Sequence, residues 1–313
     1  MNEAAKLAVV LGPTASGKSS LGVWLAERMG GEVLVCDSTQ VYRHFNIGTG
    51  KTTAEEQRGI PHHLMDLVEP EELFTAGEYR RRAVAVLDDL RRRGKTPILT
   101  AGTGLYLRGL LEGLSDTPVR SEALRARLRR QSVRQGPAYL YEMLRKKDPD
   151  AAARMAPGDT QKIIRALEVC LVSGKTVTEI HRTRGPKLEG FIVKKIGLMP
   201  TRNELYARIE QRARRMMDAG WLREAGELKA RGISPEAKAF TFIGYQQLLA
   251  HLRGEMQLDR ANLEIQQATR HYAKRQLTWF RKEPGVQWLS GFGDTSDIQE
   301  QALHYLQGAG GAE

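Results

Sequence analysis

One eight-residue stretch near the N-terminus restricts the fold more than any other feature of the chain. Residues 12–19 read Gly-Pro-Thr-Ala-Ser-Gly-Lys-Ser and match the pattern G-x-x-x-x-G-K-[ST]. The stretch lies between a continuous apolar run at 7–11 and a segment with helical character at 19–29. A loop between a buried strand and a helix is the setting in which this pattern binds phosphate groups. The sequence therefore predicts a phosphate-binding loop, or P-loop.

Each residue type in this stretch has a chemical reason to be there. The glycines allow backbone N–H groups to converge on phosphate oxygens, and the following helix adds its positive end. Lys18 supplies a mobile cation, and the Ser19 hydroxyl is suited to ligating Mg²⁺. The residues expected at a bound diphosphate or nucleotide are Gly12, Pro13, Thr14, Ala15, Ser16, Gly17, Lys18 and Ser19.

The segments that follow the loop alternate between strand and helix. Apolar runs at 32–36 and 97–99 predict buried strands, and 75–93 has helical apolar spacing that closes with cations and Gly94. Strands that alternate with helices favour a parallel sheet covered by helices. The predicted fold is therefore α/β, a doubly wound parallel sheet that contains the P-loop.

The pattern changes in the middle of the chain. Between 121 and about 180 only helical, strongly basic segments are found, and strand character returns at 191–198. We therefore predict a helical insertion at 116–189 within a catalytic core formed by 1–115 and 190–313. Later helices are expected at 203–219, 244–253 and 259–282, and a frayed tail at 308–313.

Composition adds a constraint on partners. Lysine and arginine outnumber aspartate and glutamate by 48 to 37, which gives a formal net charge of +11. A charge of this sign suits a polyanion such as nucleic acid, although it also supports solubility by itself. Two cysteines, Cys36 and Cys170, are too few for a disulfide framework or a cysteine-rich zinc site.

The sequence shows no feature that directs it to a membrane. Residues 1–3 lack the basic start of a secretory signal and are not followed by a long apolar core. No apolar run approaches the ~20 residues that span a bilayer. The protein is expected to be a cytoplasmic monomer.

One carboxylate directly follows a predicted strand, and two roles are open for it. P-loop NTPases usually have a second strand that ends in an aspartate and holds the metal. The candidate strand here continues into small and hydroxyl residues at 101–103, so Asp37 is the strand-terminal acid. Asp37 could hold Mg²⁺ or accept a proton. Alternatively, Asp37 and Ser38 could cap a following helix.

Short motifs along almost the whole chain resemble those of one family. They are 37–42 (DSTQVY), 47–49 (IGT), 61–66 (PHHLMD), 102–106 (GTGLY), 159–169 (DTQKIIRALEV), 208–212 (RIEQR), 243–245 (IGY) and 273–281 (AKRQLTWFR). With the P-loop, this ordered set resembles the tRNA dimethylallyltransferases (tRNA isopentenyltransferases), in the bacterial form without a zinc finger. Three positions depart from the family's pattern: Ala101 replaces a usual glycine, Gly50 an alanine and Lys162 an arginine.

The resemblance implies a prenyl transfer reaction. Its donor is dimethylallyl diphosphate, which occupies the P-loop where most P-loops hold ATP. Its acceptor is the exocyclic amine of the adenosine immediately 3′ of the anticodon in tRNA. Asp37 matches the family's general base, and Arg212 matches a second cation that stabilises the leaving diphosphate. Thr103 is expected beside the reacting atoms, and Mg²⁺, ligated by Ser19, is the expected cofactor.

The resemblance also implies a set of residues that contact tRNA. The adenine must leave the stack of the anticodon loop and enter a pocket, while basic helices contact the phosphates. The expected contacts are Asp37, Ser38, Thr39, Gln40, Thr103, Arg125, Gln161, Lys162, Ile163, Ile164, Arg165, Lys274, Arg275, Gln276, Trp279 and Arg281.

Plainer roles are open for three of these site residues. Arg212 could belong to a solvated basic face with Arg214 and Arg215. Thr103 could cap the helix that follows it. Trp279 could make ordinary helix packing contacts instead of stacking on a base.

Two other functions also fit parts of the pattern. A P-loop kinase for a small hydroxyl substrate explains the P-loop and Asp37 but leaves the basic insertion without a role. A non-catalytic RNA-binding module with a relic nucleotide site leaves the intact Lys18 and Ser19 unexplained. A metal site at His62 and His63 is not favoured, because adjacent side chains point apart and no third ligand is evident.

Overall fold

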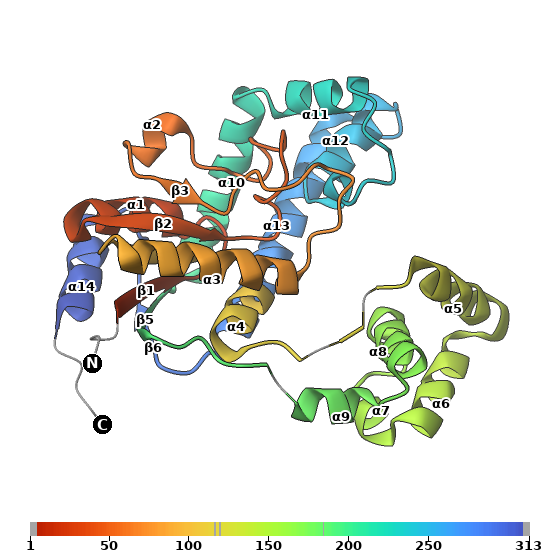
Figure 1. The fold of residues 1–313 in the computed structure, drawn as a ribbon. Helices are drawn as coiled ribbons and strands as arrows, with labels where there is room; N and C mark the ends of the chain where they lie inside the picture. Colours follow the sequence, from red (N-terminus) through yellow and green to blue (C-terminus); the bar gives the residue numbers. More distant parts are fainter. Residues whose placement is uncertain (1–4, 116, 119, 184, 309–313) are drawn as a thin grey trace. The chain divides into compact units, whose positions relative to one another are not determined.

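The computed structural model describes residues 5–115, 117, 118, 120–183 and 185–308, and the chain divides into two compact units. The core unit comprises Met1–Leu110 and Leu188–Glu313, and the helical unit comprises Leu111–Lys187 (Figure 1). The sequence predicts this division at 115/116 and 189/190, so each observed boundary lies a few residues earlier. The predictions for residues 1–3 and for the tail at 309–313 lie outside the described residues.

The strands of the core unit form one six-stranded parallel sheet with the order β3-β2-β4-β1-β5-β6. The strands are β1 (Ala5–Leu11), β2 (Gly31–Cys36), β3 (His62–His63), β4 (Thr96–Ala101), β5 (Phe191–Leu198) and β6 (Val286–Leu289). The central strands are apolar on both sides, as in parallel sheets whose two faces are covered. The predicted α/β class with a parallel sheet is confirmed, and the short edge strands β3 and β6 are additions to it.

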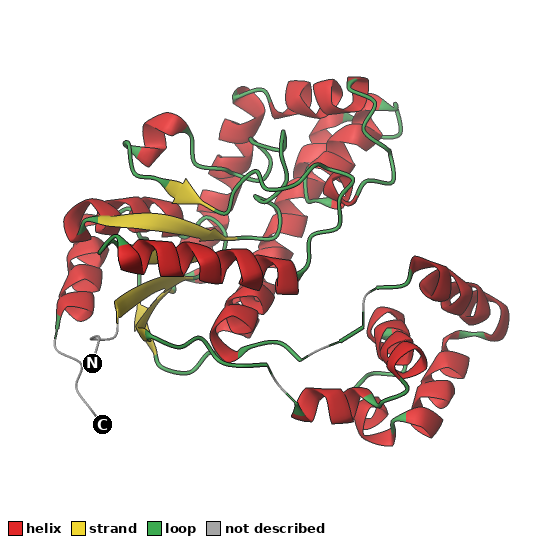
Figure 2. Ribbon diagram, in the orientation of Figure 1, coloured by secondary structure: helices red, strands yellow, loops and turns green. Residues whose placement is uncertain are grey.

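Helices cover both faces of the sheet (Figure 2). They are α1 (Lys18–Met29), α14 (Ser296–Gln307), α3 (Ala76–Arg92) and α4 (Gly104–Glu112). On one face, a buried cluster joins side chains of α1 and α14 to alternate residues of the strands. On the other face, the Tyr79 ring of α3 stacks on the Tyr106 ring of α4, with 4.7 Å between ring centroids. This arrangement makes the sheet doubly wound.

Further helices of the core unit follow β5 in the chain. They are α10 (Arg202–Asp218), α11 (Trp221–Ala230), the 3₁₀ helix η1 (Lys238–Thr241), α12 (Tyr245–Leu252) and α13 (Leu258–Phe280). Helix α13 packs against α10 and α12, and α12 packs against α11. Three of these helices lie where the sequence predicts them, whereas α11 and the final helix α14 are not among the predicted elements. A short helix, α2 (Ala54–Gln57), precedes β3.

The helical unit has a hydrophobic core of its own. Its helices are α5 (Glu122–Gln135), α6 (Pro137–Lys147), α7 (Pro149–Ala153), α8 (Thr160–Ser173) and α9 (Val177–Arg182). Leu140, Leu144, Ile163 and Leu167 are fully buried in this core. The two segments that connect the unit run side by side, because the Gly185 N–H donates to the Leu114 carbonyl at 2.9 Å.

A buried carboxylate ties the helical unit together. The Glu168 side chain is fully buried and accepts hydrogen bonds from the Ser121 N–H at 2.6 Å and from the guanidinium groups of Arg125 and Arg165 at 2.8 and 2.7 Å. Burial alone raises the pKa of Glu168, but the two arginines outweigh it and lower the pKa to about 2.

Among the described residues, no helix has the length and apolarity that crossing a bilayer requires.

Candidate active site

The P-loop has the strand–loop–helix setting that its sequence predicts. It follows β1 directly, and α1 begins at Lys18. Gly17 has a φ of 84°, and an added Cβ would lie 2.8 Å from the Gly293 nitrogen, so both conformation and space require glycine here. The Lys18 ammonium donates to the Pro13 carbonyl at 2.7 Å. A hydrogen bond between its own residues therefore closes the loop, and Lys18 is the first residue of α1.

Asp37 lies at the carboxyl end of β2, beside the turn that follows β4. Its Oδ1 accepts hydrogen bonds from the Thr39 N–H at 2.8 Å and the Thr39 hydroxyl at 2.6 Å. Its Oδ2 faces Gly102 so closely that a Cβ on Gly102 would lie 2.4 Å away. No helix follows Asp37 until α2 begins at Ala54, so the helix-capping alternative for Asp37 and Ser38 is wrong. The carboxylate is instead held at the edge of the sheet.

Thr103 holds this edge together from the neighbouring strand. Its hydroxyl accepts from the Ser38 N–H at 2.9 Å and donates to the Ser38 hydroxyl at 3.2 Å. The N–H groups of Gly102 and Thr103 both donate to the Cys36 carbonyl at 3.0 Å. In the first turn of α4, backbone N–H groups donate to the Thr103 carbonyl. The Thr103 side chain instead contacts Ser38, in the segment after β2. The capping role for the Thr103 hydroxyl is therefore not observed.

Gln276 of α13 connects the P-loop to the same turn. Its Oε1 accepts from the Thr14 N–H at 2.8 Å, and its Nε2 donates to the Gly102 carbonyl at 2.7 Å. The side chain is buried, so both ends of its amide are used inside the protein. The side chain thus fixes the spacing between two loops of the site; it also lines the cavity, and its contact with tRNA stays a prediction.

Two cations lie at the P-loop, Lys18 within the loop itself and Arg212 from α10. The Arg212 guanidinium of α10 donates to the Thr14 hydroxyl at 2.9 Å, and an added Cβ on Gly50 would lie only 1.8 Å from its Nη2. Burial lowers the pKa of Lys18 to about 7, although the Asp37 carboxylate raises it and Arg212 lowers it further. Burial also lowers the pKa of Arg212, while Asp37 raises it. Arg212 is therefore turned into the site, whereas Arg214 and Arg215 are exposed.

These groups line one cavity of about 390 Å³. A second cavity, of about 470 Å³, shares Lys18, Ser19, Gly50, Arg212 and Met216 with the first. The first cavity combines a polar end with an apolar wall. The polar residues include Lys18, Asp37, Ser38, Thr39 and Gln40, and the apolar residues include Val35, Ile209, Ala213, Phe242 and Ile265. Such a cavity can hold an anion at one end and a small apolar group beside it.

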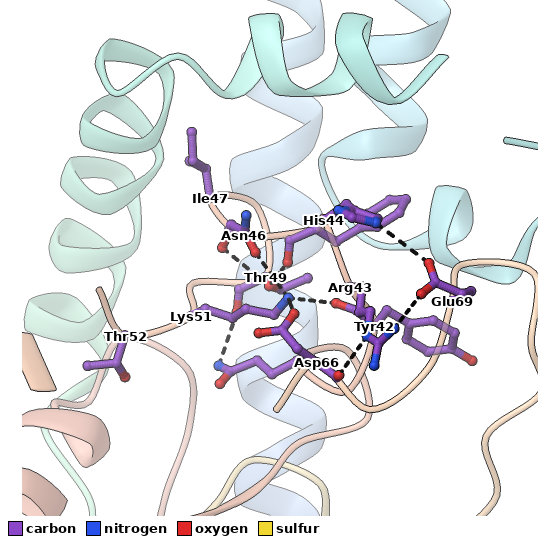
Figure 3. Close-up of polar contacts among 12 residues, drawn as sticks. Tyr42, Arg43, His44, Asn46, Ile47, Thr49, Lys51, Thr52, Asp66 and Glu69 are labelled. Atoms are coloured by element: carbon purple, nitrogen blue, oxygen red, sulfur yellow. Dashed lines mark hydrogen bonds and ion pairs between the residues drawn. The ribbon is translucent and has the colours of Figure 1, made fainter. Parts of the chain in front are cut away.

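Gln40 on the cavity wall begins a segment, residues 40–51, that internal hydrogen bonds hold in place. The Lys51 ammonium donates to the Tyr42 carbonyl at 2.6 Å, the Asn46 Oδ1 at 3.1 Å and the Asp66 carboxylate at 2.5 Å (Figure 3). Burial lowers the pKa of Lys51, and the hydrogen bond that it donates to the Asp66 carboxylate opposes this. The ion pair therefore joins the segment that follows the motif at 47–49 to the motif at 61–66. Lys51 was not among the predicted site residues.

The donor groups present suit a magnesium ion that also binds a diphosphate. The exposed Ser19 lines the cavity together with Asp37. Mg²⁺ is typically held by one or two carboxylates together with substrate phosphates, so this hydroxyl and carboxylate fit it. Within the described ranges there is no cluster of three histidine, cysteine or acidic residues suited to a metal. His63 instead contacts the Glu32 carboxylate at 2.6 Å, and His62 contacts the Ile60 carbonyl at 2.8 Å.

Four of the residues predicted to contact tRNA belong to the C-terminal part of the core unit and are exposed. Lys274, Arg275, Trp279 and Arg281 lie exposed on α13 or directly after it. Trp279 is 41% exposed, yet it also packs on Gly104, where an added Cβ would lie 2.1 Å from its Cδ1. Both roles considered for Trp279 therefore agree with its position.

The residues predicted to contact tRNA in the helical unit differ in their exposure. Ile163 and Ile164 face its core and are at most 4% exposed, so their side chains are not available to RNA. Arg125 and Arg165 are occupied by Glu168. Gln161 and Lys162 are exposed, and Lys162 pairs with Asp159. Because α8 is a helix, some side chains of residues 161–165 face the core of the helical unit and others face outward.

Substituting Gly102 with alanine should disturb Asp37 without unfolding the protein. Gly102 does not have a positive φ, so alanine is allowed by the backbone, but the new Cβ would collide with the Asp37 Oδ2. Displacing a reacting group by about 1 Å can reduce turnover by roughly 100-fold. Steady-state kinetics and thermal unfolding of Gly102→Ala would measure both effects. Gly77→Ala is the matched control, because its Cβ would meet only Thr75 at 3.7 Å; equal turnover in the two variants would contradict this account.

Comparisons with known proteins show the family of the chain. The family model described as IPP transferase matches residues 40–283. The tRNA dimethylallyltransferase of Koribacter versatilis is 48% identical over 301 residues, which cover 96% of this chain and 98% of that protein. That of Geobacter sulfurreducens is 45% identical over 96% of this chain and 97% of its own.

Two solved structures are also similar. The tRNA isopentenylpyrophosphate transferase of Bacillus halodurans aligns with a TM-score of 0.70 and 35% identity, covering 96% of this chain and 97% of that one. A eukaryotic dimethylallyltransferase, described as acting on tRNA, aligns with a TM-score of 0.75 and 28% identity, covering 91% of this chain and 74% of its own. With a P-loop, two cations and a carboxylate around one cavity, and with these relatives over nearly its whole length, the chain belongs to the IPP transferase family.

Proposed function

We propose that the protein transfers a dimethylallyl group from dimethylallyl diphosphate to the exocyclic amine of the adenosine immediately 3′ of the anticodon in tRNA. The observation that carries the proposal is the convergence of Lys18, Arg212 and Asp37 on one cavity. The cations suit a leaving diphosphate, and the carboxylate suits the removal of a proton. The family membership argues against the kinase and the non-catalytic RNA-binding alternatives.

The reaction exchanges one bond for another. The C–O bond of the donor breaks, and diphosphate leaves with its electron pair. The adenine nitrogen forms the new N–C bond and then gives up a proton. Lys18, Arg212 and the amides of the P-loop are placed to stabilise the charge that grows on the diphosphate oxygens. The apolar wall of the cavity would hold the prenyl chain and exclude water.

In this proposal Asp37 accepts the proton. Thr39 binds one carboxylate oxygen, which orients the other toward Gly102 and the cavity. A held carboxylate loses little freedom when the amine approaches. Thr103 supports this position through Ser38. Mg²⁺, held by Ser19 and by the donor's own phosphates, would neutralise part of the diphosphate charge.

The proposed tRNA contacts follow from exposure. Ser38, Thr39 and Gln40 line the cavity that would receive the flipped adenine. Lys274, Arg275 and Arg281 are the exposed cations of the predicted set in the core unit. In the helical unit, which we propose also binds tRNA, Gln161 and Lys162 are the exposed members of the set. The proposal includes a cytoplasmic location and a monomeric state.

Mass spectrometry of the RNA product tests the reaction. Purified protein, Mg²⁺, dimethylallyl diphosphate and a synthetic anticodon stem-loop should yield RNA that is heavier by one C5H8 unit. A stem-loop with guanosine at the acceptor position is the control and should gain nothing. An unchanged RNA mass, together with ATP consumption in a screen of small hydroxyl substrates, would favour the kinase instead.

A further inference from the structure

A carboxylate outside the cavity binds three consecutive backbone amides of the segment that lines it. Glu224 of α11 accepts from the N–H groups of Asn46 at 3.0 Å, Ile47 at 2.9 Å and Gly48 at 3.4 Å. The Tyr245 hydroxyl donates to the same carboxylate at 2.5 Å and accepts from the Gly48 N–H at 3.1 Å. Successive amides that point inward form a concave anion site. Here a side chain of the protein itself occupies that site.

The segment that Glu224 holds leads directly to two groups of the reaction site. The next two carbonyls, of Thr49 and Gly50, accept from the Gln40 Nε2 at 3.2 and 3.3 Å. Gly50 also lies against the Arg212 guanidinium and leaves no room for a side chain between them. The segment 46–50 therefore contacts both the pocket proposed for adenine and the cation proposed for the diphosphate.

Close packing fixes the segment and the Tyr245 side chain beside it, and Tyr245 in turn binds Glu224. A Cβ on Gly48 would lie 2.1 Å from the Trp221 Nε1 and 2.5 Å from the Tyr245 ring. The Tyr245 ring also meets the Phe45 ring edge to face, with 4.7 Å between centroids, and both side chains are fully buried. Gly244 has a φ of 95° and lies against the Trp221 ring. Glu224 and Tyr245 thus present fixed polar groups to a segment with little freedom to shift.

We propose that Glu224 and Tyr245 are positioning residues for prenyl transfer, which act by fixing the 46–50 segment that places Gln40 and Arg212. The proposal rests on the proposed function for its kinetic test. Neither residue would touch the reacting atoms.

Glu224→Gln is the direct test. The glutamine has the same shape, but one carboxylate oxygen becomes an NH2 group that cannot accept from the backbone amides. We expect kcat/KM to fall by roughly 10- to 100-fold, because small displacements of binding groups have effects of this size. KM should rise for both dimethylallyl diphosphate and the stem-loop, since the segment contacts both sites. Glu227→Gln is the matched control, because this side chain is 62% exposed on the same helix and meets only Arg223 at 3.8 Å.

A binding measurement separates this proposal from the proposed function. Isothermal titration with inorganic diphosphate reports the Arg212 side of the site without any turnover, and Glu224→Gln should bind it more weakly than wild type. A wild-type protein that binds diphosphate but transfers no prenyl group would refute the proposed function, while the titration still tests positioning. Tyr245→Phe keeps the packed ring and serves if Glu224→Gln does not fold. The positioning role would be overturned if both variants fold and show wild-type kinetics and wild-type diphosphate affinity. If only Tyr245→Phe folds, the same wild-type result in that variant would overturn it.

Discussion

Replacing Asp37 with asparagine should lower the rate of prenyl transfer by about 10²- to 10⁴-fold, the usual contribution of a general base. The amide has the shape of the carboxylate and can keep the hydrogen bonds from Thr39 through its oxygen. It cannot take a proton from the adenine amine. Single-turnover kinetics with saturating dimethylallyl diphosphate and excess enzyme would isolate the chemical step from product release.

Two controls make this result specific to proton transfer. Stem-loop affinity and thermal stability should remain close to wild type in Asp37→Asn, because the hydrogen-bonded frame persists. Glu56→Gln changes another carboxylate near the P-loop, on the wall of the second cavity, and should leave the rate nearly unchanged. A full single-turnover rate in Asp37→Asn would show that another group or water accepts the proton.

Glu168→Ala should destabilise the helical unit by about 3–5 kcal/mol, the range found when one partner of a buried ion pair is removed. The change leaves the Arg125 guanidinium, whose side chain is only 16% exposed, without its counter-charge. Hydrogen exchange of the backbone amides in α5 and α8 would measure local opening in the intact protein. Glu142→Ala removes an exposed partner of Arg145 and should change stability by less than about 1 kcal/mol.

The same carboxylate gives the effect a pH dependence with a defined sign. The folded pKa of Glu168, about 2, lies below its ordinary value of 4.5, so ionised Glu168 stabilises the folded state fully above pH 4.5. This stabilisation declines as the pH falls from 4.5 toward 2. The stability difference between wild type and Glu168→Ala should therefore shrink between pH 6 and pH 3. A difference that grows on acidification would contradict the ion-pair explanation.

Elements with strong local patterns could be predicted from the sequence. The P-loop has a specific residue motif, the central strands are continuous apolar runs, and α1, α3, α10, α12 and α13 have helical patterning. The strands β3 and β6 could not be predicted, because they are two and four residues long and depend on pairing with β2 and β5. Short edge strands acquire their structure from a neighbour that is distant in the chain.

The functional site was predictable only where its residues are close in sequence or belong to a recognised motif. Gln276 bonds to Thr14, 262 positions away, and Glu224 bonds to Ile47, 177 positions away, so no local pattern reveals either contact. Ile163 and Ile164 show the reverse case: the family resemblance implies that they contact tRNA, whereas the helical period buries both side chains.

The paired connecting segments of the helical unit have a consequence for folding. The entropy lost on closing a loop grows with the logarithm of its length, and a long insertion separates β4 from β5 in the chain. Because the Gly185 N–H binds the Leu114 carbonyl, a folded insertion brings its own ends together. Once β4 is paired with β1, the remaining chain must then close only a short effective loop to add β5 on the other side of β1. The insertion, if it folds first, shortens the search for the central strand order of the sheet.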